Sequence, residues 1–177
     1  MNYRKISKCR ICKSGKIKKV LDLGDQAFTG KFPTSYKKNI SKSPLSISLC
    51  LKCKFVQLSH NFSSSYLYNQ EYGYESGINS TMKNHLFKIS QKVVELKKLT
   101  KSSIVVDIAS NDGTLLNSYN KDIIKVGIDP ILDKFKDKYQ KINHKVSDFF
   151  SYKNFKKLNL KKKEDVITAF AVFYDVE

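Results

Sequence analysis

The chain has 177 residues and carries 33 Lys and Arg against 16 Asp and Glu, a formal net charge of +17. A chain of this length can bury a core as one domain or as a small module joined to a larger one. No apolar run approaches the length that a bilayer needs, and the N-terminus lacks the apolar stretch of a signal peptide. We therefore expect a soluble, cytoplasmic protein without a membrane partner.

The positive charge comes almost entirely from lysine, because Arg4 and Arg10 are the only arginines. Recognition of bases and phosphates relies on the guanidinium fork, and the lysines are dispersed through every segment of the chain. Nucleic acid is therefore not the expected partner. The charge can still attract a small substrate that carries phosphate.

The four cysteines form two Cys-x-x-Cys pairs, Cys9 with Cys12 and Cys50 with Cys53. Each pair places two thiolates on one tight turn, so together they supply the four ligands of a tetrahedral zinc site. A reducing cytosol disfavours disulfides. A redox Cys-x-x-Cys and four unrelated thiols remain as alternatives, but we expect structural zinc, with no open position for chemistry.

Residues 1–62 are predicted to form a small β-rich zinc module, in which the metal offsets a deficient core. Leu45, Ile47 and Leu49 alternate with Ser46 and Ser48, which predicts a half-buried strand. The stretch "FVQLSH" predicts another strand, followed by His60 in a surface loop.

Residues 63–100 are predicted to form a tyrosine-rich connector followed by an amphipathic helix. The connector is an irregular segment or a short helix with a turn, and its tyrosines can simply cover a seam between domains. The helix is expected from Ile78 to about Leu99, with Asn79 or Ser80 as its N-cap. Its apolar face is formed by Ile78, Met82, Leu86, Ile89, Val93 and Leu96.

Residues 101–177 alternate strands and helices. The predicted strands are "SIVVDIAS", "IIKVGIDP", "KINHKVSDFF" and "DVITAFAVF", and the predicted helices between them are "NDGTLLNSY", "ILDKFKDKY" and "YKNFKKLNL". The fold class is therefore α/β: a β-rich zinc module followed by the N-terminal half of a doubly wound, Rossmann-like sheet.

The loop after the first of these strands is poor in glycine. It contains only Gly113, and it carries Asp107 and Asp112, whose charges would repel a pyrophosphate. Carboxylates at this position suit a ligand with an ammonium group and hydroxyls. A nicotinamide-dependent sugar enzyme is disfavoured for this reason.

Acids follow the next two strands as well. Asp129 can accept both hydrogen bonds of a ribose diol, Asp148 can accept one from an exocyclic amine, and Phe149 can form an apolar wall for a purine. This pattern favours S-adenosylmethionine over NAD. Helix capping and ordinary surface charge are the alternative reading of these acids.

Three stretches together resemble one enzyme family. They are "CRIC" with "LDLGDQAFTGKFP" and "CLKCKFVQL"; "EYGYESGINSTM"; and "VVDIASNDGTLL" with "VGIDP" and "SDFF". The chain resembles zinc-binding, S-adenosylmethionine-dependent C-methyltransferases that act on nucleotide-linked deoxysugars. The resemblance implies a class I methyltransferase sheet, S-adenosylmethionine and Zn²⁺ as cofactors, a nucleotide-linked sugar as substrate, and a zinc module that helps to cover the active-site cleft.

The resemblance also implies roles for individual residues. Zinc would be held by Cys9, Cys12, Cys50 and Cys53. The cofactor would contact Asp107, Ser110, Asn111 and Gly113 through its methionine part, Asp129 through its ribose, and Asp148 and Phe149 through its adenine. Further candidate cofactor contacts are Ala109, Asp112 and Pro130. The candidate catalytic residues are Tyr72, Tyr74, Tyr174 and Asp175.

Two departures from the family pattern stand out. Ala109 takes the place of a common glycine, and it is small enough to fit beneath the ligand. Where many relatives have a His after the fourth strand, this chain has Tyr174 and Asp175, so it would use another base or another substrate.

The sheet of such enzymes has about six or seven strands, and four are predicted here. We therefore expect the chain to be a fragment that is inactive by itself, with its last strand as an unprotected edge. The leading alternative is a zinc-ribbon binding module for nucleic acid or a protein partner. The sequence does not predict the oligomeric state.

Overall fold

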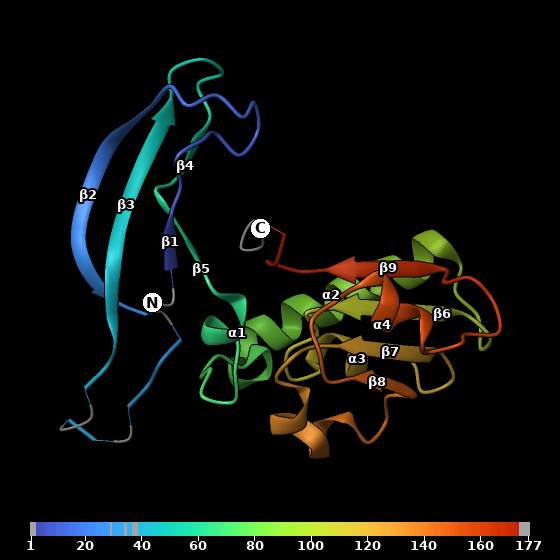
Figure 1. Cartoon of the computed structure of the whole chain (residues 1–177). Helices are drawn as coiled ribbons and strands as arrows, with labels where there is room; N and C mark the ends of the chain where they lie inside the picture. The colour runs from blue at the N-terminus through green and yellow to red at the C-terminus, as the bar shows by residue number, and fades with distance from the viewer. Residues whose placement is uncertain (1–2, 29, 34, 37–38, 174–177) are drawn as a thin grey trace. The chain divides into compact units, whose positions relative to one another are not determined.

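The computed structural model describes residues 3–28, 30–33, 35–36 and 39–173, which form two compact units (Figure 1). Unit 1 ends at Gly73 and unit 2 begins at Tyr74. Among the described residues, no helix is long and apolar enough to cross a membrane.

Unit 1 is built from short antiparallel pairings. Its elements are β1 (Tyr3–Lys5), β2 (Ile17–Ala27), β3 (Lys42–Cys50), β4 (Val56–Leu58), β5 (His60–Phe62) and α1 (Ser64–Leu67). Strands β2, β3 and β4 form one sheet in that order, and β1 pairs with β5. His60 therefore lies in a strand and stacks edge-on against Tyr3, so its prediction as a surface loop residue was wrong.

Strand β3 is half-buried as predicted, but its buried face is the serine face and not the apolar one. Ser46 and Ser48 are buried, whereas Ile47 is only partly buried between its exposed neighbours Leu21 and Leu58. The reason is hydrogen bonding. Gln57, which pairs with Ser48, accepts from the Arg10 amide at 2.8 Å and donates to the Lys8 carbonyl at 3.3 Å. The first cysteine loop thus packs on the polar face.

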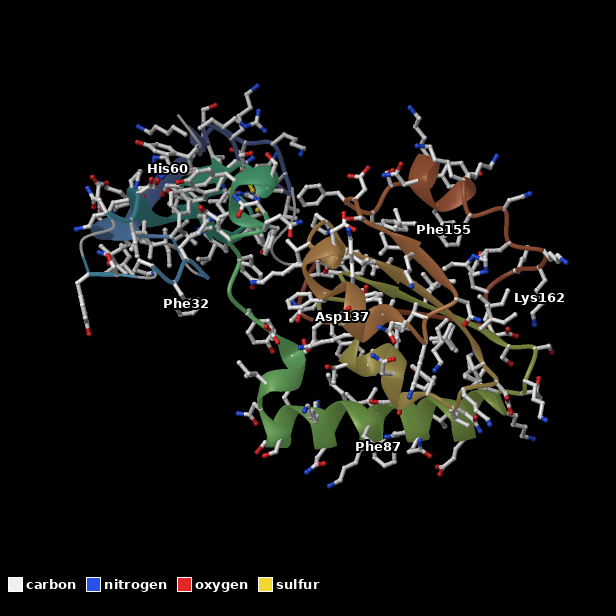
Figure 2. All side chains as sticks on the ribbon, turned by 90° about the horizontal axis from the view of Figure 1, so that it is seen from below. Phe32, His60, Phe87, Asp137, Phe155 and Lys162 are labelled. Carbon is white, nitrogen blue, oxygen red and sulfur yellow. The ribbon has the colours of Figure 1, made fainter. Side chains whose placement is uncertain are left out.

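Unit 2 has a parallel sheet with helices on both sides (Figure 2). Its elements are η1 (Ser76–Ile78), α2 (Ser80–Lys97), β6 (Ile104–Ile108), α3 (Thr114–Ser118), β7 (Ile124–Ile128), η2 (Leu132–Tyr139), β8 (His144–Val146), α4 (Tyr152–Lys156) and β9 (Val166–Ala169). The strand order is β8-β7-β6-β9 and every pairing is parallel. The predicted α/β alternation is therefore confirmed.

The core of unit 2 fills both faces of this sheet. Val106 and Val126 belong to a buried cluster on one face, against which Phe155 of α4 packs. On the other face, Leu116 of α3 and Tyr139 of η2 lie close to Gly127. Because the two central strands are covered on both sides, their sequences are continuous apolar runs interrupted by few polar residues.

Helix α2 begins as predicted, since the Asn79 side chain accepts from the amides of Thr81 and Met82. Its buried face is narrower than predicted. Ile78 and Leu96 are 80% and 70% exposed, and Phe87 points away from the sheet (Figure 2). Contact with α3 is made around Ser90, whose small side chain reaches the Ser118 carbonyl and permits close approach of the two helices.

Two other elements differ from the sequence prediction. The segment expected as a second helix, η2, is a 3-10 helix kinked at Phe135 rather than an α-helix. Strand β9 is shorter than "DVITAFAVF", and Ile167 is exposed because β9 has a partner on one side only among the described strands. None of the four residues of β9 is fully buried.

Gly127 gives a direct test of packing in unit 2. A Cβ atom at this position would lie 2.7 Å from the Tyr139 ring and 3.1 Å from Leu116. We expect Gly127→Ala to lower the free energy of unfolding by about 1–3 kcal/mol, measured by urea denaturation. Ser102→Ala, on an exposed turn, is the control. Wild-type stability of Gly127→Ala would show that this close packing is absent.

Candidate functional site

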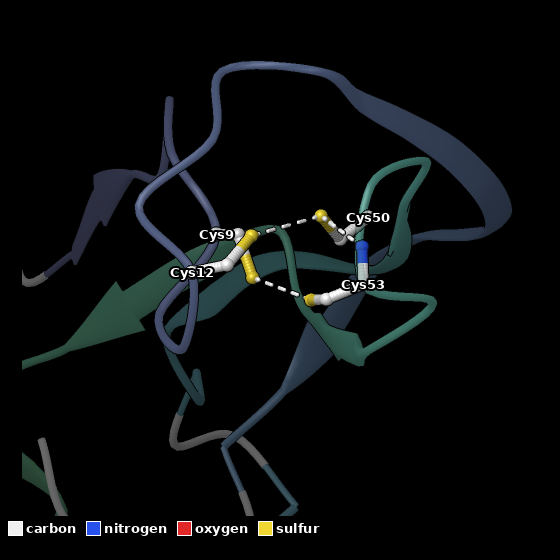
Figure 3. Close-up of side chains that lie close together, drawn as sticks. All are labelled: Cys9, Cys12, Cys50 and Cys53. Carbon is white, nitrogen blue, oxygen red and sulfur yellow. Dashed lines mark hydrogen bonds between the residues drawn. The ribbon is translucent and has the colours of Figure 1, made fainter.

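The four cysteines converge at one point of unit 1, although 37 residues separate the two pairs (Figure 3). Their sulfur atoms all lie within 4.8 Å of one another, and the Sγ atoms of Cys9 and Cys53, and of Cys12 and Cys50, are 3.5 Å apart. Tetrahedral zinc, with Zn–S bonds of about 2.3 Å, holds its sulfurs roughly 3.8 Å apart. The residues therefore fit a zinc ion.

The two cysteine loops have the same local structure. Lys13 and Lys54, which directly follow each pair, both adopt a left-handed conformation, with φ of 60° and 63°. Their amides donate to the Cys9 and Cys50 carbonyls at 3.0 and 2.9 Å. Each lysine ammonium group also bonds to a carbonyl three residues earlier, Lys13 to that of Arg10 and Lys54 to that of Leu51. The two loops are therefore closed in the same way.

The two thiols of the second loop have opposite pKa shifts. The amide of Cys53 donates to Cys50 Sγ at 3.5 Å. This contact, together with the Lys52 amide, outweighs burial and lowers the pKa of Cys50 to about 6. Against the Phe55 amide, burial and the neighbouring thiols raise the pKa of Cys53 to about 12, so the turn by itself favours a thiolate at Cys50 only.

A second polar cluster lies at the carboxyl ends of the parallel strands in unit 2. Asp107 is buried near the end of β6 and accepts a hydrogen bond of 2.6 Å from Thr168 of β9. Burial raises the pKa of Asp107 to about 7; the Thr168 hydrogen bond opposes this shift and the charge of Asp129 adds to it. Burial also raises the pKa of Asp129, against the amides of Ile131 and Asn111.

The segment Ala109–Gly113, which we call the ligand loop, contains three left-handed residues. Ala109, Asn111 and Gly113 have φ of 56°, 49° and 75°. Glycine adopts such angles without strain. Replacement of the family's common glycine by Ala109 therefore affects the backbone conformation as well as the size of the side chain. The loop is held by Asp129, which accepts from the Asn111 amide at 2.8 Å, and by the buried Tyr139 hydroxyl, which donates to the Asn111 carbonyl at 2.8 Å.

Three side chains of the ligand loop contact the protein itself. Asp112 is fully buried and accepts from the amides of Gly77 and Thr114. Asn111 bonds to the backbone of Tyr74 and Ser76. Ser110 is also buried, and its hydroxyl lies 2.8 Å from the Tyr139 hydroxyl. The cofactor contacts of these residues stay predictions.

The strand order aligns the predicted acids along one edge of the sheet, because β6, β7 and β8 are neighbours. Asp148, after β8, is exposed and accepts from Asn154 and from the Phe149 amide, both at 2.7 Å. Phe149 and Pro130 are partly buried. Asp148 therefore helps to fix the start of α4. This contact agrees with the alternative reading, in which the acids after the strands cap helices.

The two predicted catalytic residues that the structure describes, Tyr72 and Tyr74, belong to different units. Tyr72 belongs to unit 1, where its ring lies so close to Gly30 that a Cβ there would be 2.4 Å away. Tyr74 belongs to unit 2 and is 46% exposed. Tyr174 and Asp175 lie outside the described residues.

The sequence analysis missed Thr168, Tyr139 and Lys138, which support the acids and the ligand loop. No motif marks them, because each meets its partner, Asp107 for Thr168 and the ligand loop for Tyr139 and Lys138, only after a crossover brings its element back to the sheet. A cavity of about 100 Å³ lies elsewhere, in unit 1, beside Phe28, Lys31 and Tyr66.

One comparison with known proteins matches unit 1. A family model named Methyltransf_13, with the description "Putative zinc binding domain", matches residues 9–68, which is 60 of the 177 residues. The matched segment contains all four cysteines. No curated protein matches the chain. The match and the cysteine geometry together support zinc binding and a methyltransferase-related role.

We expect the purified protein to contain one zinc ion per chain, measured by metal analysis. Cys50→Ser should abolish binding and unfold unit 1, because binding of structural zinc is coupled to folding. Lys54→Gly is the matched control, since it changes the same loop and keeps all four sulfurs. It also relieves backbone strain, because glycine adopts the left-handed conformation of Lys54 more easily. Full zinc content in Cys50→Ser would contradict the site.

Asp107 should make the protein less stable at high pH. The folded carboxyl has a pKa of about 7, so between about pH 4 and 7 the folded state keeps a proton that the unfolded state releases. Stability therefore falls as pH rises through this window. Asp107→Asn should flatten the profile and add roughly 2–4 kcal/mol at pH 8.

The measurement for Asp107 is urea denaturation between pH 4 and 8. Asp137→Asn removes an exposed carboxyl of η2 and should keep the wild-type slope. Parallel profiles for Asp107→Asn and the wild type would exclude a buried, titrating Asp107.

Proposed function

We propose that this chain is part of an S-adenosylmethionine-dependent methyltransferase that methylates a carbon of a nucleotide-linked keto-deoxysugar. The observation that carries the proposal is the pair of buried carboxyl groups, Asp107 and Asp129, at the ends of two adjacent parallel strands. Among the described residues, neither acid has a cationic side-chain partner. Burying such acids costs stability, and that cost is typical of a ligand site. The methyltransferase-associated match to unit 1 supports the same proposal.

The strand order supports this choice of ligand class. In doubly wound sheets, ligands bind outside the carboxyl ends, and β8-β7-β6-β9 corresponds to the 3-2-1-4 part of the common order. The ligand loop has one glycine and is flanked by Asp107 and Asp129, so it suits an ammonium and a ribose better than a pyrophosphate. Asp107 would bind the ammonium group, and Asp129 would accept from the ribose hydroxyls.

The remaining roles follow from position along the same edge. Asp148 and Phe149 would bind the adenine. They follow β8, which lies on the far side of β7 from β6 and the ligand loop, so they can reach the end of the cofactor beyond the ribose. The cofactor would supply an electrophilic methyl group. Methylation beside a keto group also needs a base for the carbon-bound proton and a donor for the enolate oxygen. Tyr74 is the candidate donor in unit 2, and Tyr72 is the candidate in unit 1.

Calorimetry with S-adenosylhomocysteine tests the proposal on the full chain. We expect binding at one site, and we expect Asp129→Asn to weaken it about ten- to a hundredfold, because a charged hydrogen-bond acceptor for the ribose is lost. Asp122→Asn is the matched control, since Asp122 is exposed before β7, at the opposite end of the strand.

Two results would contradict this function. Absence of binding heat for the folded, zinc-loaded wild type would exclude the cofactor site. Equal affinity of Asp129→Asn and the wild type for S-adenosylhomocysteine would show that the ligand does not bind at these strand ends. Tight nucleic-acid binding that falls steeply with salt would instead favour the binding-module alternative.

A further inference from the structure

The residues Tyr74–Asn79, which we call the strap, run against the ligand loop inside unit 2. The strap contains η1 and ends at the N-cap of α2. Its first residue, Tyr74, has a side chain that is 46% exposed. The position of Tyr74 therefore depends on what holds the backbone of the strap.

Asn111 is the residue that joins the strap to the ligand loop. Its side-chain oxygen accepts from the Ser76 amide at 2.9 Å, and its side-chain nitrogen donates to the Tyr74 carbonyl at 3.1 Å. The backbone amide of the same residue donates to Asp129 at 2.8 Å. One asparagine thus connects the proposed ribose acceptor to both ends of the Tyr74–Ser76 backbone.

A second clamp holds the middle of the strap through Asp112. This carboxylate accepts from the Gly77 amide at 3.0 Å and from the Lys138 ammonium at 3.1 Å. Lys138 also bonds to Glu75 at 2.6 Å. A Cβ at Gly77 would lie 2.4 Å from Thr114 Oγ1, so the strap approaches the loop as closely as only glycine permits.

The two residues that hold the strap, Asn111 and Asp112, differ in whether they are bonded to Asp129. Asp112 is fully buried and holds the strap through the Gly77 amide and Lys138, and neither contact involves Asp129, so it anchors the strap independently of Asp129. Asn111 is held in a left-handed conformation by its bond to Asp129, the group that would receive a ribose. A ligand that fixes the Asp129 carboxylate also fixes the Asn111 amide and, through it, the strap.

We propose that Asn111 is a positioning residue that sets the place of Tyr74 and tightens the strap when a nucleoside ligand occupies Asp129. This coupling rests on the proposed function, whereas the anchoring of the strap by Asn111 does not. It assigns Asn111 to the strap rather than to direct contact with the methionine part of the cofactor.

Amide hydrogen exchange, resolved by NMR on the full chain, tests the proposal. In the wild type we expect the Ser76 amide to exchange slowly, and to slow further by about tenfold when S-adenosylhomocysteine is added. In Asn111→Gly the Ser76 amide should exchange about tenfold faster, with no further effect of S-adenosylhomocysteine. The Gly77 amide, which Asp112 holds, should change much less.

Asn159→Gly is the matched control. Asn159 is exposed, is left-handed with φ of 44°, and lies outside the strap and the ligand loop, so both variants replace a left-handed asparagine by glycine. We expect wild-type exchange at Ser76 in this variant. Urea denaturation of the two variants separates a local opening of the strap from a global loss of stability.

The outcomes distinguish the two proposals. Unchanged Ser76 exchange in Asn111→Gly would overturn the role of Asn111. Protection of the Asn111 amide by S-adenosylhomocysteine without protection of Ser76 would overturn the coupling and leave the proposed function intact. If S-adenosylhomocysteine changes no amide while Asn111→Gly still releases Ser76, the proposed function and the coupling both fail, and Asn111 remains an anchor of the strap.

Discussion

The architecture of unit 2 depends on satisfying the backbone of one strained turn, the ligand loop. Three of its five residues are left-handed, which separates their amides and carbonyls from regular hydrogen-bonding partners. Asp129 receives one amide, Tyr139 donates to one carbonyl, and Asp112 receives the amides that flank the turn on the strap and on α3. The buried acids are thus structural partners of the loop before any ligand arrives.

This arrangement carries an energetic cost that an ordinary core avoids. Asp107 and Asp129 are buried near each other with hydrogen-bond donors, but no cationic side chain of the part of the chain that the structure describes pairs with them, and burial raises the pKa of both. A neutral amide at Asp107 would be cheaper to bury. The proposed function accounts for this cost, because a site for a positively charged or hydroxyl-rich ligand needs carboxyl groups at such positions.

The sequence predicts the features that depend on local pattern. The two cysteine pairs, the β-branched runs of β6 and β7 and the N-cap at Asn79 are all found. The sequence fails where a distant segment decides the outcome. Alternation in β3 predicts two faces but cannot say which one the Arg10 loop will cover, and α2 buries Ser90 instead of Leu96 because α3 lies beside it. Thr168 and Tyr139 join the candidate site only through crossovers that no local motif marks.

Contacts with distant segments also explain the buried polar side chains of both units. In unit 1 the serine face of β3 is buried because a cysteine loop, rich in backbone polar groups, packs there, and an apolar surface would leave those groups without partners. In unit 2, Asp112 is buried because the strap presents its amides to it. Hydrophobic pattern therefore locates the strands, while the hydrogen-bonding needs of tight turns decide which polar side chains are buried. The tight turns in both units are also where the candidate metal and ligand sites lie, since a turn that fixes its own backbone also fixes the side chains a ligand requires.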